Sequence, residues 1–158
     1  MKLKNVLLSV SAAVLLGTAA FAGDAKIMVD EPYLRSTNPK VAAAFMGLMN
    51  HAGQDDRLIS ATSDIAKRVE LHTHVADGHG VMKMTEIKGG IAVPAEGLAH
   101  LKRGGDHIMF MGVTKPLNDG DVIEVTLTFE KAGDVKLEIP VDNDRKPQAD
   151  AHGEHKTH

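Results

Sequence analysis

Short segments of alternating apolar and polar residues, separated at regular intervals by turn residues, constrain the fold of this chain more than any other feature. The segment DVIEVTLTFE, residues 121–130, alternates apolar with polar side chains from Ile123 to Phe129. Such alternation is typical of a β-strand with one buried face. Clusters of turn residues recur about every 10 to 15 residues, which is the spacing of an all-β sandwich built from hairpins and Greek-key connections. They are NPK (38–40), HAGQDD (51–56), DGHG (77–80), KGG (88–90), RGG (103–105), NDGD (118–121) and KAGD (131–134).

Two other segments bear on this prediction. In DVKLEIPV, residues 134–141, Val135, Leu137 and Ile139 share one face, and Gly133 can supply the positive φ of a hairpin that joins this strand to the preceding one. KVAAAFMGLMN, residues 40–50, is rich in alanine and methionine, which favour a helix by intrinsic propensity. An isolated helix of about ten residues is marginal in water, however, so we predict a strand there too.

The first 22 residues have the composition of a secretory signal peptide. Lys2 and Lys4 precede an apolar run, and Ala20-Phe21-Ala22 is a small-x-small cleavage pattern. The run 6–16 is short for a membrane span, which needs roughly 20 apolar residues. We therefore predict export to a periplasm, cleavage after Ala22 and no membrane insertion of the mature chain.

The remaining sequence predicts one domain followed by a tail. Residues 23–141 carry the predicted strands and are enough for a single core. Residues 142–158, DNDRKPQADAHGEHKTH, have no apolar face, and we expect this tail to be disordered. The tail is histidine-rich, with His152, His155 and His158.

Charge and cysteine content exclude several classes of function. The formal net charge is −3, so nothing suggests binding to nucleic acid or to anionic lipid. The chain has no cysteine, which excludes disulfides, a thiolate nucleophile and a blue-copper centre. Histidine, methionine and carboxylates remain as metal ligands. No nucleophile motif or paired acid and base stands out, so we do not expect an enzyme.

Three segments place histidine or methionine at alternate positions. They are VELHTHV (69–75), GVMKM (80–84) and DHIMFMG (106–112). On a strand, each would present these side chains on one face. Any one of them alone is more simply explained as a core or surface residue. Together, thioether and imidazole donors are the ligands that a soft ion such as Cu(I) selects.

These segments resemble the periplasmic copper chaperone family called PCuAC. The resemblance extends over about residues 25–141 and includes IAVPAEGLAHLKRGGDHIMFMG (91–112) and KPLNDGDVIEVTLTFEKAGDVKLEIPV (115–141). It implies a cupredoxin-like β-sandwich that carries Cu(I) and delivers it to a copper protein. By resemblance, the recipient is the binuclear copper centre of cytochrome c oxidase, together with a Sco-type thiol protein. The implied copper ligands are His72, Met84, His107 and Met109.

The spacing of these four residues differs slightly from the family pattern. Eleven residues separate His72 from Met84, and twenty-two separate Met84 from His107, one more than usual in each interval. Both intervals contain glycine turns, where an added residue need not shift the register of a strand. His74 shares the face of His72 and lies closer to Met84, so it is an alternative first ligand.

Three further expectations concern the surroundings of the ligands. Ile108 and Phe110 should be buried, whereas His107 and Met109 should reach a solvent-accessible rim. Glu70 and Asp106 are each near a candidate histidine and are possible acceptors for an imidazole N–H. The tail histidines lack nearby sulfur and are candidates for capturing Cu(II).

Two alternative functions remain open at this stage. The chain could be a Zn or Cu(II) scavenger that uses the tail together with His72, His74 and His79. It could also be a structural interaction module whose histidines and methionines belong to its core.

Overall fold

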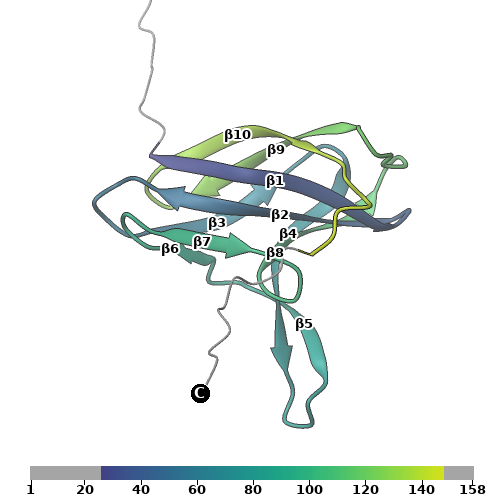
Figure 1. Ribbon diagram of the computed structural model, residues 1–158, viewed down its shortest axis with the longest axis horizontal. Helices are drawn as coiled ribbons and strands as arrows, with labels where there is room; N and C mark the ends of the chain where they lie inside the picture. Colours follow the sequence, from purple (N-terminus) through teal and green to yellow (C-terminus); the bar gives the residue numbers. More distant parts are fainter. Residues whose placement is uncertain (1–25, 148–158) are drawn as a thin grey trace, which may run out of the picture.

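Strands account for the regular structure of the part of the protein that the computed structural model describes, residues 26–147 (Figure 1). In chain order they are β1 (Ile27–Asn38), β2 (Val41–Asn50), β3 (Asp56–Thr62), β4 (Ala66–Ala76), β5 (Met82–Glu86), β6 (Ile91–Val93), β7 (Leu98–Leu101), β8 (His107–Val113), β9 (Val122–Phe129) and β10 (Gly133–Pro140).

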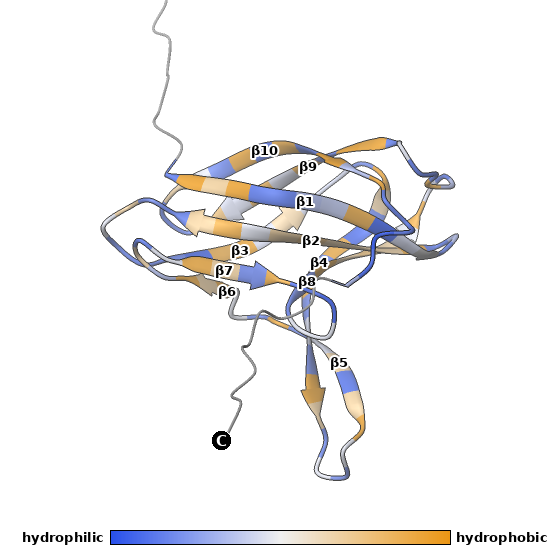
Figure 2. Cartoon of the chain, in the orientation of Figure 1, coloured by the Kyte–Doolittle hydropathy of each residue, from blue (hydrophilic) through white to orange (hydrophobic). Residues whose placement is uncertain are grey.

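The strands form two antiparallel sheets that pack face to face. Sheet A has the order β1-β2-β8-β4-β5, with β7 also paired to β2, and sheet B has the order β10-β9-β3-β6. Bands of apolar and polar residues alternate along the strands in Figure 2. The inward residues of both sheets make one core, whose largest fully buried apolar side chains are Phe110, Phe129, Leu34, Leu48, Leu58, Ile108, Ile123, Leu127, Ile139 and Val93. The all-β sandwich predicted from the sequence is confirmed.

The hairpin between β9 and β10 forms where the alternation predicts it. Gly133 has φ +79°, and it pairs with Phe129 across the turn. Along β9 the buried positions are Ile123, Val125, Leu127 and Phe129. Along β10, Val135, Leu137 and Ile139 are less exposed than the residues between them.

The alanine-rich segment is also a strand, as predicted. β2 lies inside sheet A, between β1 on one side and β8 and β7 on the other. Ala42, Ala44 and Leu48 are fully buried in the core, and Ala43 and Phe45 are buried on the opposite face. Burial on both faces overrides the helix propensity of the segment, because neighbouring strands satisfy its backbone and cover its side chains.

β4 belongs to two different pairings. Residues from Ala66 to His72 pair with β8 within the sheet, and residues from His72 to Ala76 pair with β5. The second half of β4 and β5 form an arm that projects from the sandwich (Figure 1). His72 is the residue at which β4 passes from one pairing to the other.

The chain after β10 lies against β1. The amide of Asp142 donates to the Leu34 carbonyl at 2.9 Å, and Arg35 Nε donates to the Asn143 carbonyl at 2.9 Å. The Arg145 guanidinium lies over the Tyr33 ring, 4.6 Å from its centre. Asp142, Asn143 and Arg145 therefore contact the sandwich, while residues 148–158 of the expected tail lie outside the described residues.

Some expectations fall outside the described residues. The predicted signal peptide, with its cleavage after Ala22, and the tail histidines His152, His155 and His158 all lie there. Within residues 26–147, no helix has the length and apolarity to cross a membrane.

Asp56 ties the start of β3 to the turn between β9 and β10. Its Oδ1 accepts from the amides of Arg57 and Lys131 at 2.7 and 2.9 Å, and its Oδ2 accepts from the amide of Ala132 at 2.8 Å. Burial of this carboxyl acts to raise its pKa. The three backbone hydrogen bonds and the charge of Lys131 outweigh burial, so the pKa of Asp56 lies below its usual 3.8.

This depressed pKa predicts a pH dependence of stability. A carboxyl with a lower pKa in the folded state stabilises the protein above its unfolded pKa, near 3.8, and that stabilisation is lost as the pH falls further. Asp56→Asn, which removes the charge and one acceptor oxygen, should cost about 1 to 3 kcal/mol at pH 7. Urea unfolding at pH 7 and at pH 3 should show a smaller difference between variant and wild type at pH 3. An unchanged difference would contradict this role of Asp56.

Candidate metal centre

The register of sheet A places the predicted ligands on one face. His72 pairs with His107 and Glu70 pairs with Met109 between β4 and β8, while His74 pairs with Met84 between β4 and β5. Paired residues of antiparallel strands project to the same side, and so do residues two apart along a strand. The neighbouring positions Leu71, Ile108 and Phe110 are buried in the core, so the ligand face is the outer face of sheet A.

His107 lies beneath other rings on this outer face. It is 2% exposed, and its ring centre is 5.3 Å from that of His74 and 6.0 Å from those of His72 and Phe45. The expectation that His107 reaches a solvent-accessible rim is therefore wrong. Phe45 belongs to a small outer cluster with Tyr33 and Ala43.

The other expectations about exposure agree with the structure. Ile108 and Phe110 are fully buried, and Met109 is partly exposed. Met84, on the projecting arm, is 46% exposed. The ligand face therefore runs from a buried imidazole at its centre to an accessible thioether on the arm.

His107 has one ring nitrogen engaged and the other available. Its Nδ1 lies 2.9 Å from the Gly105 carbonyl, which can only accept a hydrogen bond. Nδ1 therefore carries the proton, and the lone pair of Nε2 is available to a metal. Burial lowers the pKa of His107, and the nearby His74 and His72 lower it further, against the opposing effects of the Gly105 carbonyl and Asp106. This imidazole is therefore neutral at pH 7, as a metal ligand must be.

His72 shows the complementary arrangement. Its Nε2 lies 2.9 Å from Glu70 Oε2, and Arg68 Nε lies 3.1 Å from the other oxygen of that carboxylate. The Nδ1 of His72 is buried and has no hydrogen-bond partner. A buried nitrogen without a partner is costly, and a bound metal would satisfy it. Glu70 thus contacts a candidate ligand as expected, whereas Asp106 influences His107 through its charge.

Two further candidate donors, Met111 and His79, lie outside the set of four predicted ligands. Met111 Sδ accepts from Arg68 at 3.4 Å. His79 lies in the turn 77–80, beyond the last pair of the arm, Ala76 with Met82. The structure therefore brings His72 and His74 close to His107, and places His79 at the far end of the arm.

Nitrogen and carboxylate ligands alone do not form a ready metal site. Within residues 26–147, no three histidine, aspartate or glutamate side chains are grouped closely enough to hold an ion. A copper site on this face thus requires the methionine sulfurs, or rotation of the imidazole rings. The donor set of neutral imidazoles and thioethers suits Cu(I) in particular.

Phe45 and the Gly105 carbonyl are contributors that sequence reasoning missed. Gly105 lies two residues before His107, in a turn that the sequence did predict. Phe45 lies on β2, and only the pairing of β2 with β8 brings its ring to His107. No local pattern in the sequence links those two residues.

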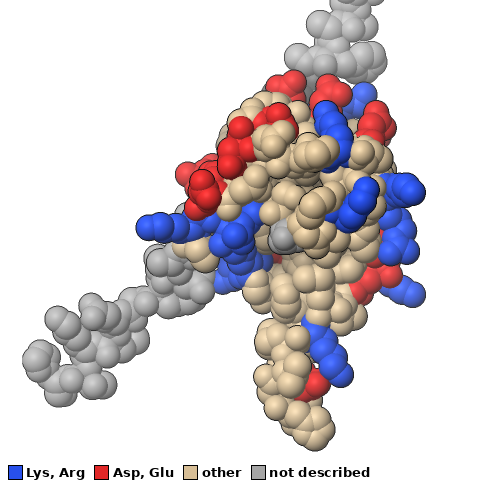
Figure 3. Space-filling model, turned by 90° about the vertical axis from the view of Figure 1, so that its right-hand side faces the viewer, with Lys and Arg blue, Asp and Glu red and all other residues tan. Residues whose placement is uncertain are grey.

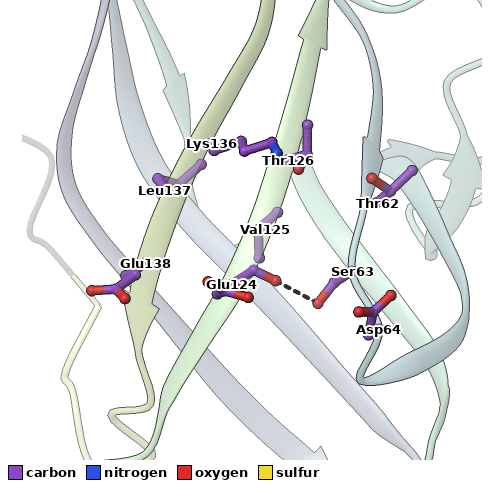
Figure 4. Close-up of a pocket in the computed structure, with 9 residues that line it drawn as sticks. All are labelled: Thr62, Ser63, Asp64, Glu124, Val125, Thr126, Lys136, Leu137 and Glu138. Carbon is purple, nitrogen blue, oxygen red and sulfur yellow. Dashed lines mark hydrogen bonds between the residues drawn. The ribbon is translucent and has the colours of Figure 1, made fainter.

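A hollow on sheet B is separate from this face. It is lined on sheet B by Thr62, Ser63, Asp64, Glu124, Val125, Thr126, Lys136, Leu137 and Glu138 (Figure 4). None of these is a histidine or methionine, and Ser63 Oγ donates to the Glu124 carbonyl at 2.7 Å. On the face that Figure 3 shows, the projecting arm carries few charged side chains.

The sequence matches a known family over most of the described residues. The match is to the LpqE-like family of putative lipoproteins and extends over residues 27–141. A relative, the putative lipoprotein Lxx21020 of Leifsonia xyli subsp. xyli, is 33% identical over 115 residues, which are 73% of this chain and 69% of that protein.

Solved structures with a similar fold include copper-binding domains. The copper-bound PCuAC domain from PmoF2 is 28% identical, with a TM-score of 0.60 over 74% of this chain and 92% of that domain. The Cu(I) form of DR1885 from Deinococcus radiodurans is also 28% identical, with a TM-score of 0.58 over 80% of this chain and 86% of that one. These likenesses agree with the expected resemblance to PCuAC domains.

The contact between Glu70 and His72 predicts the tautomer of that histidine. In the metal-free protein, His72 should be protonated on Nε2 and His107 on Nδ1, because each of these nitrogens faces an oxygen acceptor. Imidazole ¹⁵N chemical shifts measure both. Glu70→Ala should remove the tautomer preference of His72 and leave that of His107 unchanged, so His107 serves as an internal control. If His72 keeps its tautomer in this variant, Glu70 does not determine it.

Proposed function

This chain belongs to the LpqE-like family of putative lipoproteins, and we propose that it is a copper carrier, because its fold is similar to that of copper-binding PCuAC domains. It binds Cu(I) through His72, Met84, His107 and Met109 and passes the ion to another copper protein. The role is that of a metallochaperone, and no catalytic step is involved.

One observation carries the proposal. Two imidazoles on the outer face of sheet A each have one nitrogen facing an oxygen acceptor and one nitrogen left for a metal. Histidines that bind metals characteristically have this arrangement, since the acceptor orients the ring and fixes its tautomer. The pairings of β4 place Met84 and Met109 on the same face.

The chemistry of these donors suits transport. Thioethers and neutral imidazoles are soft enough to prefer Cu(I), and an oxidising compartment does not convert them into disulfides. Thioethers bind without losing a proton, so binding at the sulfurs does not compete with protonation. A partner can approach Met84 directly because it is exposed on the arm.

We infer that the copper is carried outside the cytoplasm. The predicted signal peptide and the putative-lipoprotein relative both favour export, and we propose a periplasmic location. The 158 residues include no cysteine, so they provide no thiol for attachment of a lipid. The proposed recipient is the binuclear copper centre of cytochrome c oxidase, reached directly or together with a Sco-type protein.

Cu(I) affinity should separate the ligands from their neighbours. Met84→Leu and Met109→Leu should each weaken Cu(I) binding by at least about tenfold, because leucine fills the space without a sulfur, at a cost in stability below about 1.5 kcal/mol. Anaerobic competition with a Cu(I) chelator measures the affinity. Met28→Leu is the matched control, since Met28 is 54% exposed on β1, outside the proposed ligand set.

Phe110 provides the opposite comparison on the same strand. Phe110→Ala should cost about 3 to 5 kcal/mol of stability, because its fully buried ring leaves a cavity. Were Met109→Leu to reduce stability more than Phe110→Ala while leaving Cu(I) affinity intact, the ligand face would be wrongly assigned.

Delivery is tested with a recipient. The Cu(I)-loaded protein, mixed with the copper-free copper domain of cytochrome c oxidase in the presence of a chelator that captures free Cu(I), should raise the copper content of that domain. Met84→Leu protein, loaded with copper to the same extent, should give the recipient domain a different copper content, since Met84 is the exposed donor. Copper found only on the chelator would rule out this recipient.

A further inference from the structure

His74 is an imidazole of the ligand face that the four-ligand set leaves unused. It pairs with Met84 across the arm, and its ring centre lies 5.3 Å from that of His107. This is closer than the 6.0 Å between the rings of His72 and His107. His74 is therefore placed between the exposed thioether and the buried imidazole.

The nitrogens of His74 are only lightly constrained. Its Nδ1 lies 3.5 Å from the Gly105 carbonyl, the same oxygen that His107 Nδ1 approaches at 2.9 Å. A separation of 3.5 Å is at the outer limit of a hydrogen bond, so this ring rotates at little cost. With both Nδ1 atoms near one carbonyl, the Nε2 atoms of His74 and His107 are left for a metal.

We propose that His72, His74 and His107 together hold Cu(II), so that this face accepts copper in either oxidation state. The inference rests on the proposed function, in which the same face binds Cu(I). Cu(II) is harder than Cu(I) and favours imidazole nitrogen over thioether sulfur. With Met84 and Met109 as donors the face suits Cu(I), and with His74 in their place it suits Cu(II).

The separations of the His72 and His74 rings from the His107 ring fit such a site. A metal at roughly 2 Å from each imidazole nitrogen places the ring centres roughly 4.5 to 6 Å apart, depending on the angle at the metal. The observed separations from His107 are 5.3 and 6.0 Å. Small rotations close the site, in keeping with the lack of a ready three-residue group within residues 26–147.

Glu70 adds a charge that favours the more highly charged ion. Its carboxylate lies 2.9 Å from His72 Nε2 and is itself half-buried. A negative charge beside a ligand stabilises Cu(II) more than Cu(I), because the interaction scales with the charge of the ion. Arg68 offsets part of this charge from the more exposed side.

The test uses the whole protein with His152, His155 and His158 replaced by asparagine, which removes imidazoles that would compete for Cu(II). Cu(II) binding is followed by electron paramagnetic resonance, with pulsed measurements that count the imidazole ligands, and Cu(I) binding by anaerobic chelator competition. His74→Asn is compared with His79→Asn, an exposed histidine at the end of the arm. Urea unfolding checks that both variants fold, and His74→Gln is the substitute if His74→Asn does not.

The protein with the three tail substitutions, here called the parent, should bind one Cu(II) through three imidazoles. His74→Asn should lower Cu(II) affinity by at least about 30-fold and change Cu(I) affinity by less than about threefold, whereas His79→Asn should alter neither. Unchanged Cu(II) binding in His74→Asn, or an equal loss of both ions, would overturn the inference. A parent that binds Cu(I) but no Cu(II) would also overturn it and leave the proposed function intact. A protein that binds Cu(II) through three imidazoles but no Cu(I) would overturn the proposed function, and with it the claim that the face accepts both ions, and would leave only the Cu(II) site.

Discussion

The register between β4 and β8 is the constraint on which the rest of the site depends. It sets His72 directly opposite His107 and Glu70 directly opposite Met109. A shift by one residue would turn His72 and Glu70 into the core and bring Leu71 to the surface. The core prevents such a shift, because Leu71 on β4 and Ile108 and Phe110 on β8 are buried together. Packing on one face of sheet A therefore fixes the arrangement of the predicted ligands on the other.

Much of the fold could be predicted because period and turn chemistry are local properties. The alternation from Ile123 to Phe129, followed by Gly133, predicts a hairpin without reference to the rest of the chain. The segment 40–50 was harder, since its propensity favours a helix and only burial on both faces of sheet A makes it a strand. The common face of histidines and methionines also follows from the alternation, once the strands that carry them are recognised.

The rest of the site depends on contacts between distant residues. The buried His107 has Phe45, from another strand, beside it, and no sequence pattern predicts that contact. The available nitrogen of each histidine depends on whether its acceptor is a carbonyl, as at Gly105, or a carboxylate, as at Glu70. Residues 142–147 have the composition of a disordered tail, yet Asn143 and Arg145 bind β1 through contacts that only the folded sandwich provides.

The arm can open while the domain stays folded, so the lifetime of an ion in the proposed site does not depend on the stability of the whole domain. Within the described part of sheet A, β5 is paired with β4 alone, through five residue pairs, and all its residues are exposed. The free energy of local opening depends only on the contacts that are broken, so β5 can separate from β4 while the sandwich core stays folded. In the proposed site, this separation withdraws Met84 and leaves His72, His107 and Met109 in place. The domain can therefore stay folded while the proposed site releases copper, because different parts of the chain set these two properties.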